Sequence, residues 1–174
     1  MIYIMSFFNL LIFGSEEEII RPTNNYKTYV EGEIVVGLTN SLSFEEFLDT
    51  VFPLGEIKNV EVSNINYSTD LPENKKEILE KYLSQFDFID RYSRVKYLED
   101  DKMWNIEFWI SGFGKENISD WYKIVKELNL KHIPNRSQSV LLRVEKGKEK
   151  YWINKLSALK LFRYVDLNYI TTVF

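Results

Sequence analysis

One arrangement of apolar residues occurs twice in the chain, a strand followed by an amphipathic helix and a second strand. The first copy covers residues 33–67 and the second covers residues 139–170. In both copies, short alternating or β-branched runs predict the strands, and apolar residues at helical spacing predict the helix between them. Because parallel neighbouring strands need a crossover connection, each copy is expected to form a right-handed β-α-β unit.

The helix of the first copy has a clear start and a clear end. Ser43 is followed three residues later by Glu46, which is the pattern of a capping box. Pro53 and Gly55 are expected to stop the helix. Between these signals, one apolar stripe contains Phe44, Phe47, Leu48, Val51 and Phe52. The strand that follows is expected to show an irregularity in its alternation.

The segment between the two copies predicts two further helices and a hairpin. Asp70 as the cap and Pro72 in the first turn predict a helix, whose buried stripe would contain Ile78, Leu79, Tyr82, Leu83 and Phe86. Alternating residues on both sides of the turn 99–102 predict a hairpin, and another helix is expected over residues 117–129. The fold class is therefore α+β, a sandwich with helices on one face of a mainly antiparallel sheet.

The N-terminal residues differ in composition from the rest of the chain. Residues 1–13 are almost wholly apolar, too short for a membrane-spanning helix of about 20 residues but long enough for the apolar region of a secretory signal. We expect either a leader over residues 1–15, with a protein that is secreted or in the cell envelope, or a buried N-terminal element of a cytoplasmic protein. A linker is expected over 16–29 and the α+β domain over 30–174, as one unit or as fused halves 30–134 and 135–174. Membrane attachment is expected only through an uncleaved leader.

Composition narrows the classes of function. The chain has 22 basic and 26 acidic residues, which predicts no binding to nucleic acid. The absence of Cys removes thiol nucleophiles and zinc–thiolate sites. The single histidine, His132, is expected to cap a helix or to lie exposed near a helix end. One histidine excludes most metal sites and most acid–base mechanisms that use imidazole. We therefore expect a protein that is not an enzyme and that holds no metal or cofactor.

Three stretches near the C-terminus carry a resemblance to a known family. A strand over residues 139–144 is followed by the helix that contains Trp152-Ile153-Asn154-Lys155-Leu156, and the last strand reads Tyr164-Val165-Asp166-Leu167-Asn168-Tyr169. This order resembles the end of a subtilisin-type propeptide, or subtilisin propeptide-like peptidase inhibitor, with Leu167 where that family often has Pro. Residues 29–38 and the helix after Ser43 resemble its opening. The resemblance covers about half the chain, and residues 70–134 are longer than the family needs.

The resemblance implies a ferredoxin-like fold and a role as inhibitor or folding chaperone of a serine protease. In that family the sheet packs on the protease, and the segment after the last strand lies extended in the substrate cleft. Carried onto this chain, that segment follows Tyr169 and contains Thr171, Thr172, Val173 and Phe174. Its backbone would bind as an added strand, and Phe174 would fill a hydrophobic pocket. No protease domain follows, so we expect action in trans. In the alternative, Val173 and Phe174 only complete the core.

The four tryptophans divide into candidates for the core and one candidate for a partner surface. Trp104, Trp121 and Trp152 lie in apolar stripes and are expected to be buried. Trp109 points to the opposite face of its strand from Trp104, so it is either exposed or covered by a helix. Exposed aromatic residues on a sheet are typical of protein contacts. Two functions remain open: a protease-binding module of the propeptide type, and an envelope-associated or soluble interaction protein with no protease partner.

Overall fold

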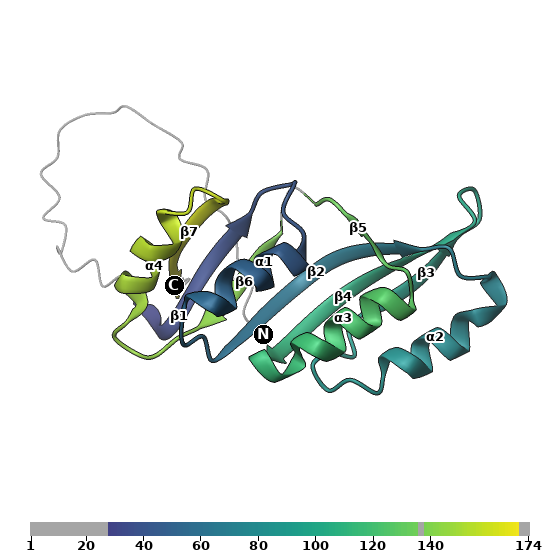
Figure 1. The fold of residues 1–174 in the computed structure, drawn as a ribbon, viewed down its shortest axis with the longest axis horizontal. Coiled ribbons are helices and arrows are strands. Elements are labelled where there is room, and N and C mark those ends of the chain that lie inside the picture. The colour runs from purple at the N-terminus through teal and green to yellow at the C-terminus, as the bar shows by residue number, and fades with distance from the viewer. Residues whose placement is uncertain (1–27, 136–137, 171–174) are drawn as a thin grey trace, which may run out of the picture.

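The computed structural model describes residues 28–135 and 138–170 of the 174-residue chain (Figure 1). In these residues four helices accompany one seven-stranded sheet. The elements in chain order are β1 (Tyr29–Leu38), α1 (Phe44–Val51), β2 (Asn59–Thr69), α2 (Lys76–Leu83), β3 (Arg94–Leu98), β4 (Met103–Phe113), α3 (Ile118–Glu127), β5 (Lys131–Ile133), β6 (Ser139–Arg143), α4 (Glu149–Ser157) and β7 (Phe162–Tyr169). The expected leader over residues 1–15 and most of the expected linker lie outside the described residues.

The strands form a single sheet in the order β3-β4-β2-β6-β1-β7, and the short β5 pairs with β2. Every paired set of strands is antiparallel, which confirms the expected α+β class with a mainly antiparallel sheet. The sheet takes strands from both the 30–134 and the 135–174 parts of the chain.

The expectation that each β-α-β copy joins neighbouring strands is wrong. β1 and β2 run parallel to each other, but β6 lies between them and is antiparallel to both. In the same way, β1 lies between the parallel strands β6 and β7. In each copy, a strand of the other copy thus lies between the two parallel strands. Every neighbouring pair is therefore antiparallel and has the perpendicular hydrogen bonds of that arrangement.

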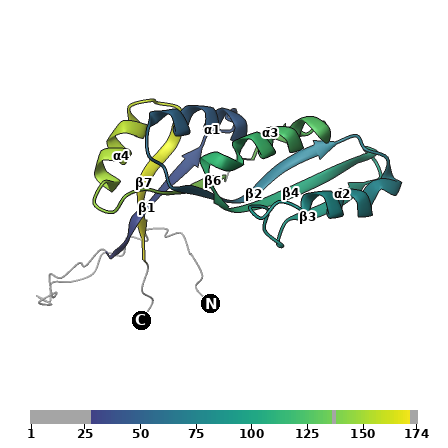
Figure 2. The same ribbon diagram turned by 60° about the horizontal axis from the view of Figure 1, so that its bottom comes forward.

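One face of the sheet carries the core. Figure 2 shows α1, α3 and α4 over this face, and α2 lies beside α3, where the Tyr82 hydroxyl donates to Glu127 Oε2 at 2.5 Å. Alternate residues of the strands point into the core, for example Ile34 and Val36 of β1, both 0% exposed. The result is a two-layer arrangement whose second sheet face has no covering helix among the described elements.

The capping box at the start of α1 is confirmed. Ser43 Oγ accepts from the backbone N–H of Glu46 at 3.2 Å, and Glu46 Oε2 accepts from the backbone N–H of Ser43 at 2.8 Å. The helix ends at Val51, and Pro53 follows in a 3₁₀ turn. The capping pair and the proline are local signals, so the bounds of α1 follow from residues that are close in sequence.

The start expected for α2 is wrong. Asp70 does not cap the helix, because a 3₁₀ turn at Glu73–Lys75 comes first and α2 begins at Lys76 without a side-chain cap. Ile78 on this helix is 60% exposed instead of buried. Leu79 and Leu83 still face the core. The helix is therefore anchored by only part of the predicted stripe.

Glu149 connects the start of α4 to β1. It is 3% exposed, and its Oε1 accepts from the backbone N–H of Gly32 at 2.6 Å and of Gly147 at 3.1 Å. Burial opposes ionisation of this carboxyl. The backbone N–H groups of Glu149, Gly32 and Gly147 outweigh burial, so the pKa of Glu149 lies below its ordinary value of 4.5. The charged carboxylate thus stabilises the folded state.

Replacing Glu149 by glutamine is expected to lower the free energy of unfolding by about 1–3 kcal/mol at neutral pH, because a neutral amide is a weaker acceptor for three N–H groups. The folded-state pKa is lowered, so the contribution is present above pH 4.5 and is lost as the pH falls through the lowered pKa. Urea unfolding at neutral and at acidic pH measures this, with the exposed Glu99→Gln as control. A difference between wild type and E149Q that stays the same at both pH values would contradict the assignment.

Candidate docking surface on the open face of the sheet

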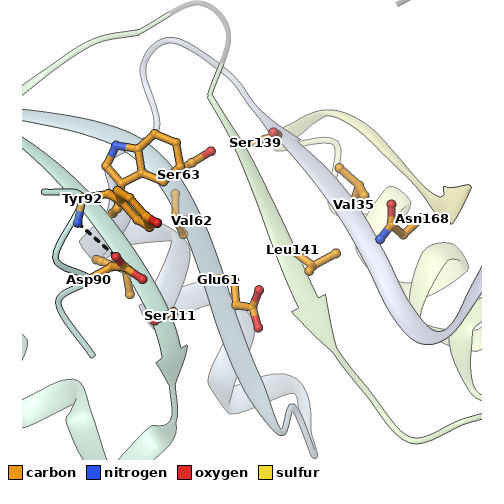
Figure 3. A pocket seen from close by; sticks show the side chains of 12 residues that line it. Val35, Glu61, Val62, Ser63, Asp90, Tyr92, Ser111, Ser139, Leu141 and Asn168 are labelled. Carbon is orange, nitrogen blue, oxygen red and sulfur yellow. Dashed lines mark hydrogen bonds between the residues drawn. The ribbon is translucent and has the colours of Figure 1, made fainter. Parts of the chain in front are cut away.

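The open face of the sheet contains a groove of about 440 Å³. Figure 3 shows Tyr92 and Asp90 on one side of it, Glu61 in the middle, and Val35, Leu141 and Asn168 on the other side. Trp109 also lines it. The groove crosses β4, β2, β6, β1 and β7 in their order in the sheet. We call this surface the open-face groove.

Two β-bulges shape the open-face groove. In β2, two residues lie between Val62 and Ile65, opposite one residue between Ile110 and Phe108 of β4, and Asn64 has φ +66°. In β4 the extra residue lies before Phe113, where Gly112 has φ +63°. Bulges of this kind bend a strand and increase its twist. The first bulge also explains the predicted irregularity, since it keeps both halves of β2 facing the core.

An aromatic pair forms one wall of the groove. The rings of Tyr92 and Trp109 lie 6.1 Å apart between centroids, at an angle of 57°. Trp109 Nε1 donates to Glu107 Oε1 at 2.9 Å, and the Trp109 backbone N–H donates to Ser93 Oγ at 2.9 Å. The Trp109 carbonyl accepts from the backbone N–H of Asp90 at 2.7 Å. These bonds hold the wall in place before any partner arrives, which reduces the entropy lost on binding.

A polar network crosses four strands beside the groove. Asn168 of β7 donates to Glu33 Oε2 of β1 at 2.7 Å. Arg143 of β6 lies 3.4 Å from Glu33 Oε1 and 2.9 Å from Glu61 Oε1 of β2, and its Nε also donates to Glu61 Oε1 at 3.0 Å. Between this network and the aromatic wall, Val35 and Leu141 are directly opposed on neighbouring strands. The groove thus has an apolar floor with a polar border.

Two side chains expected to bind a partner, Trp109 and Tyr169, fall within the described residues. Trp109 lines the open-face groove and is half-buried. Tyr169 is 40% exposed at the end of β7, where it pairs with Tyr29, and it does not line the groove. The expected binding residues Thr171, Thr172, Val173 and Phe174 lie outside the described residues.

The other three tryptophans are buried, as expected. Trp104 is 2% exposed, Trp121 is 0% exposed and Trp152 is 5% exposed. Trp109 is therefore the one tryptophan of the four with substantial access to solvent. This distinction makes its indole a specific reporter for the open face.

The place expected for His132 is wrong. It lies in β5 opposite Tyr67 of β2, and its ring is half-buried, with its centroid 5.5 Å from that of Tyr67. Residues 128–130 connect α3 to β5. This strand pairs with residues 66–68 of β2, and β6 pairs with residues 59–62 of the same strand. His132 therefore belongs to the sheet and does not cap a helix.

Tyr67 and Trp121 share a carboxylate acceptor beneath the helices. Glu45 Oε1 accepts from the Tyr67 hydroxyl at 2.7 Å and from Trp121 Nε1 at 2.8 Å. Burial, together with the charge of Glu45 and this hydrogen bond, raises the pKa of Tyr67 far above its ordinary value. The phenol therefore stays protonated and donates. This satisfies buried polar groups of the core, so the cluster has a structural explanation.

Among the described residues β7 pairs only with β1, and its outer edge is partly blocked by one of its own side chains. The Asp166 carboxylate accepts from the backbone N–H of Leu167 at 2.8 Å, which occupies a donor that an added strand would need. Charged residues on edge strands commonly prevent unwanted pairing. The open face is for this reason a better candidate for docking than the β7 edge.

Sequence reasoning did not identify Asp90 and Tyr92 as part of the site. They lie in an irregular segment between α2 and β3, where no periodicity shows which way a side chain points. Val35 and Leu141 had a usable signal, since each is an apolar residue at an outward position of its strand. An apolar residue on a face expected to be solvated indicates a contact surface.

Within the described residues there is no group of three or more His, Cys, Asp or Glu side chains placed to hold a metal ion. In the same residues, no helix has the length and apolar character needed to cross a bilayer. Comparison with protein-family models, with curated proteins and with solved structures finds no match to this chain.

Proposed function

We propose that the chain is a non-catalytic protein-binding module of the subtilisin propeptide type, acting as an inhibitor or folding chaperone of a subtilisin-like serine protease. The observation that carries the proposal is the open-face groove. Its preorganised aromatic wall of Trp109 and Tyr92 lies on a sheet face that no described helix covers. Buried aromatic anchors bordered by polar groups are typical of binding hot spots.

The order of four strands supports the propeptide hypothesis. These strands lie in the order β2-β6-β1-β7, and α1 and α4 are the two helical connections. This order agrees with a ferredoxin-like β-α-β-β-α-β arrangement. On this interpretation, the segment between β2 and β6 is an insertion that widens the sheet by β3 and β4. The insertion supplies Trp109, Tyr92 and Asp90, so it extends the docking face beyond the four-stranded unit. The expected leader over residues 1–15 would place the module in the cell envelope or outside the cell.

The C-terminal residues provide the second part of the proposed mechanism. Ile170 is held to the start of β1, because its backbone N–H donates to the Thr28 carbonyl at 2.8 Å. Residues 171–174 follow from this fixed point, and the proposal is that they occupy the substrate cleft as an extended strand. The sheet face would provide affinity, and the tail would block the cleft.

Titration of a subtilisin-like protease with the full chain tests the proposal. We expect tight inhibition of the cleavage of a fluorogenic peptide, competitive with substrate. Deleting residues 171–174 is expected to raise the inhibition constant roughly tenfold to hundredfold, equivalent to about 1.4–2.8 kcal/mol. Thermal unfolding of the truncated chain serves as the control for folding. A truncated chain that inhibits as well as the full chain would show that the tail plays no part.

A chain that neither binds nor inhibits the protease would favour the second candidate, an interaction protein with no protease partner. The open-face groove favours this candidate independently of the tail, because its wall and floor belong entirely to the described sheet and to the segment before β3. Calorimetry with a protease whose active-site serine is replaced separates the two. The propeptide hypothesis requires binding in this assay, and the interaction-protein hypothesis requires none.

A further inference from the structure

The charged groups that line the open-face groove are both acidic. They are Glu61 and Asp90, and no Lys or Arg lines the groove within the described residues. Glu107 lies next to the wall, where it accepts from Trp109 Nε1. The groove therefore attracts positive rather than negative groups.

The two lining carboxylates differ in how far they are already neutralised. Glu61 forms an ion pair with Arg143 at 2.9 Å. Asp90 takes part in none of the salt bridges found among the described residues, and its Oδ1 accepts only from the backbone N–H of Tyr92 at 3.0 Å. Its carboxylate thus retains capacity for a further donor. Figure 3 shows this carboxylate beside the Tyr92 ring, at the aromatic wall.

The aromatic wall suits a planar cation. One guanidinium already lies on it, since Arg91 Cζ is 5.1 Å from the centroid of the Tyr92 ring and Arg91 Nη2 donates to the Tyr92 hydroxyl at 3.2 Å. Trp109 is the better of the two rings for a cation–π contact, because indole gives the strongest interaction of this type. An arginine from outside can therefore stack on Trp109 while Asp90 accepts its N–H groups.

We propose that the open-face groove binds an arginine side chain presented by an extended segment of the partner protein. This inference rests on the proposed function, because it names the chemistry of the partner at the same surface. Arginine is favoured over lysine, since its planar guanidinium both stacks on an aromatic ring and donates two parallel hydrogen bonds to a carboxylate. The apolar floor of Val35 and Leu141 receives the aliphatic part of the segment.

An array of immobilised octapeptides tests the inference with the full chain as the soluble binder. The peptides share their flanking residues and carry Arg, Lys, citrulline or Glu at the centre. Citrulline has nearly the shape of arginine but no charge. We expect the Arg peptides to retain at least about fivefold more protein than the citrulline peptides, with Lys between them and Glu lowest, and the preference to weaken as salt is added.

The variant Asp90→Asn removes the charge and keeps an oxygen that can accept from the Tyr92 backbone N–H. In D90N the Arg signal is expected to fall to the citrulline level. Asp100→Asn, at the exposed turn between β3 and β4, is the matched control and is expected to keep the preference. Equal signals for Arg and citrulline with the wild-type chain, at any level, would overturn the inference, and so would a D90N variant that keeps the full preference.

The array and the protease titration fail independently. An array without Arg preference, together with intact protease inhibition, overturns the inference and leaves the proposed function standing. An Arg preference that depends on Asp90, in a chain that does not bind the protease, supports the chemistry of the groove and overturns the propeptide hypothesis.

Discussion

Replacing Trp121 by alanine is expected to lower the free energy of unfolding by about 3–5 kcal/mol. Trp121 is 0% exposed, and its ring contacts Phe44, Tyr67 and Phe108 with centroids 5.2 to 5.7 Å away. The substitution leaves a cavity between α1, α3 and the sheet. It also removes the indole N–H that donates to Glu45 Oε1 at 2.8 Å.

Urea unfolding followed by circular dichroism measures the effect of this substitution. Because a fall of this size approaches the whole stability of many domains, Trp121→Phe provides a milder second variant that keeps a ring and loses the hydrogen bond. Ile78→Ala is the control, since Ile78 is 60% exposed on α2, and it is expected to change stability by less than about 1 kcal/mol. A loss at Trp121 no larger than that at Ile78 would contradict the packing described for the core.

Replacing Trp109 by alanine is expected to weaken partner binding by roughly thirtyfold or more, equivalent to about 2 kcal/mol, as for a hot-spot aromatic. The indole forms the wall of the open-face groove with Tyr92 and is half-buried in the free protein. A partner that covers the groove would bury the rest of the indole. Truncation removes this contact and leaves the Glu107 carboxylate without its donor.

The matched control for Trp109 is another exposed aromatic residue away from the open face. Tyr151 on α4 is 56% exposed and lies on the helical side of the sheet, so Tyr151→Ala is expected to leave affinity unchanged. Calorimetric titration against the same protease compares both variants with the wild-type chain. Equal losses for W109A and Y151A would indicate a general effect on the fold, and no loss for W109A would exclude the open face as the contact surface.

Local signals in the sequence predicted much of the secondary structure. The capping pair Ser43 and Glu46 defined the start of α1, and the alternation from Trp104 to Ile110 predicted β4 and its buried face. These features depend on residues close in sequence, so tertiary packing has little to change. The start of α2 failed because the segment after Pro72 first forms a 3₁₀ turn, and nothing local distinguishes that turn from the first turn of an α-helix.

The strand order could not be derived from the sequence in the same way. β6 pairs with β1 and with β2, which lie about a hundred and about eighty residues earlier in the chain. The sequence of a short apolar strand does not indicate which strand it pairs with. The same limit applies to the groove. Asp90 reaches it because Ile89 forms a bridge to Ile110 and the Asp90 backbone N–H donates to the Trp109 carbonyl. These are contacts between irregular backbone and a strand, and periodicity does not predict them.

Fluorine NMR of the chain labelled with 5-fluorotryptophan tests most directly whether a partner binds to the open face. The four tryptophans give four signals, and Trp109→Phe identifies the one from the groove. On addition of an unlabelled subtilisin-like protease, the Trp109 signal is expected to shift or broaden, while those of the buried Trp104 and Trp121 keep their positions. A complex that forms without any change at Trp109 would contradict the account, as would a protease that leaves all four signals unchanged.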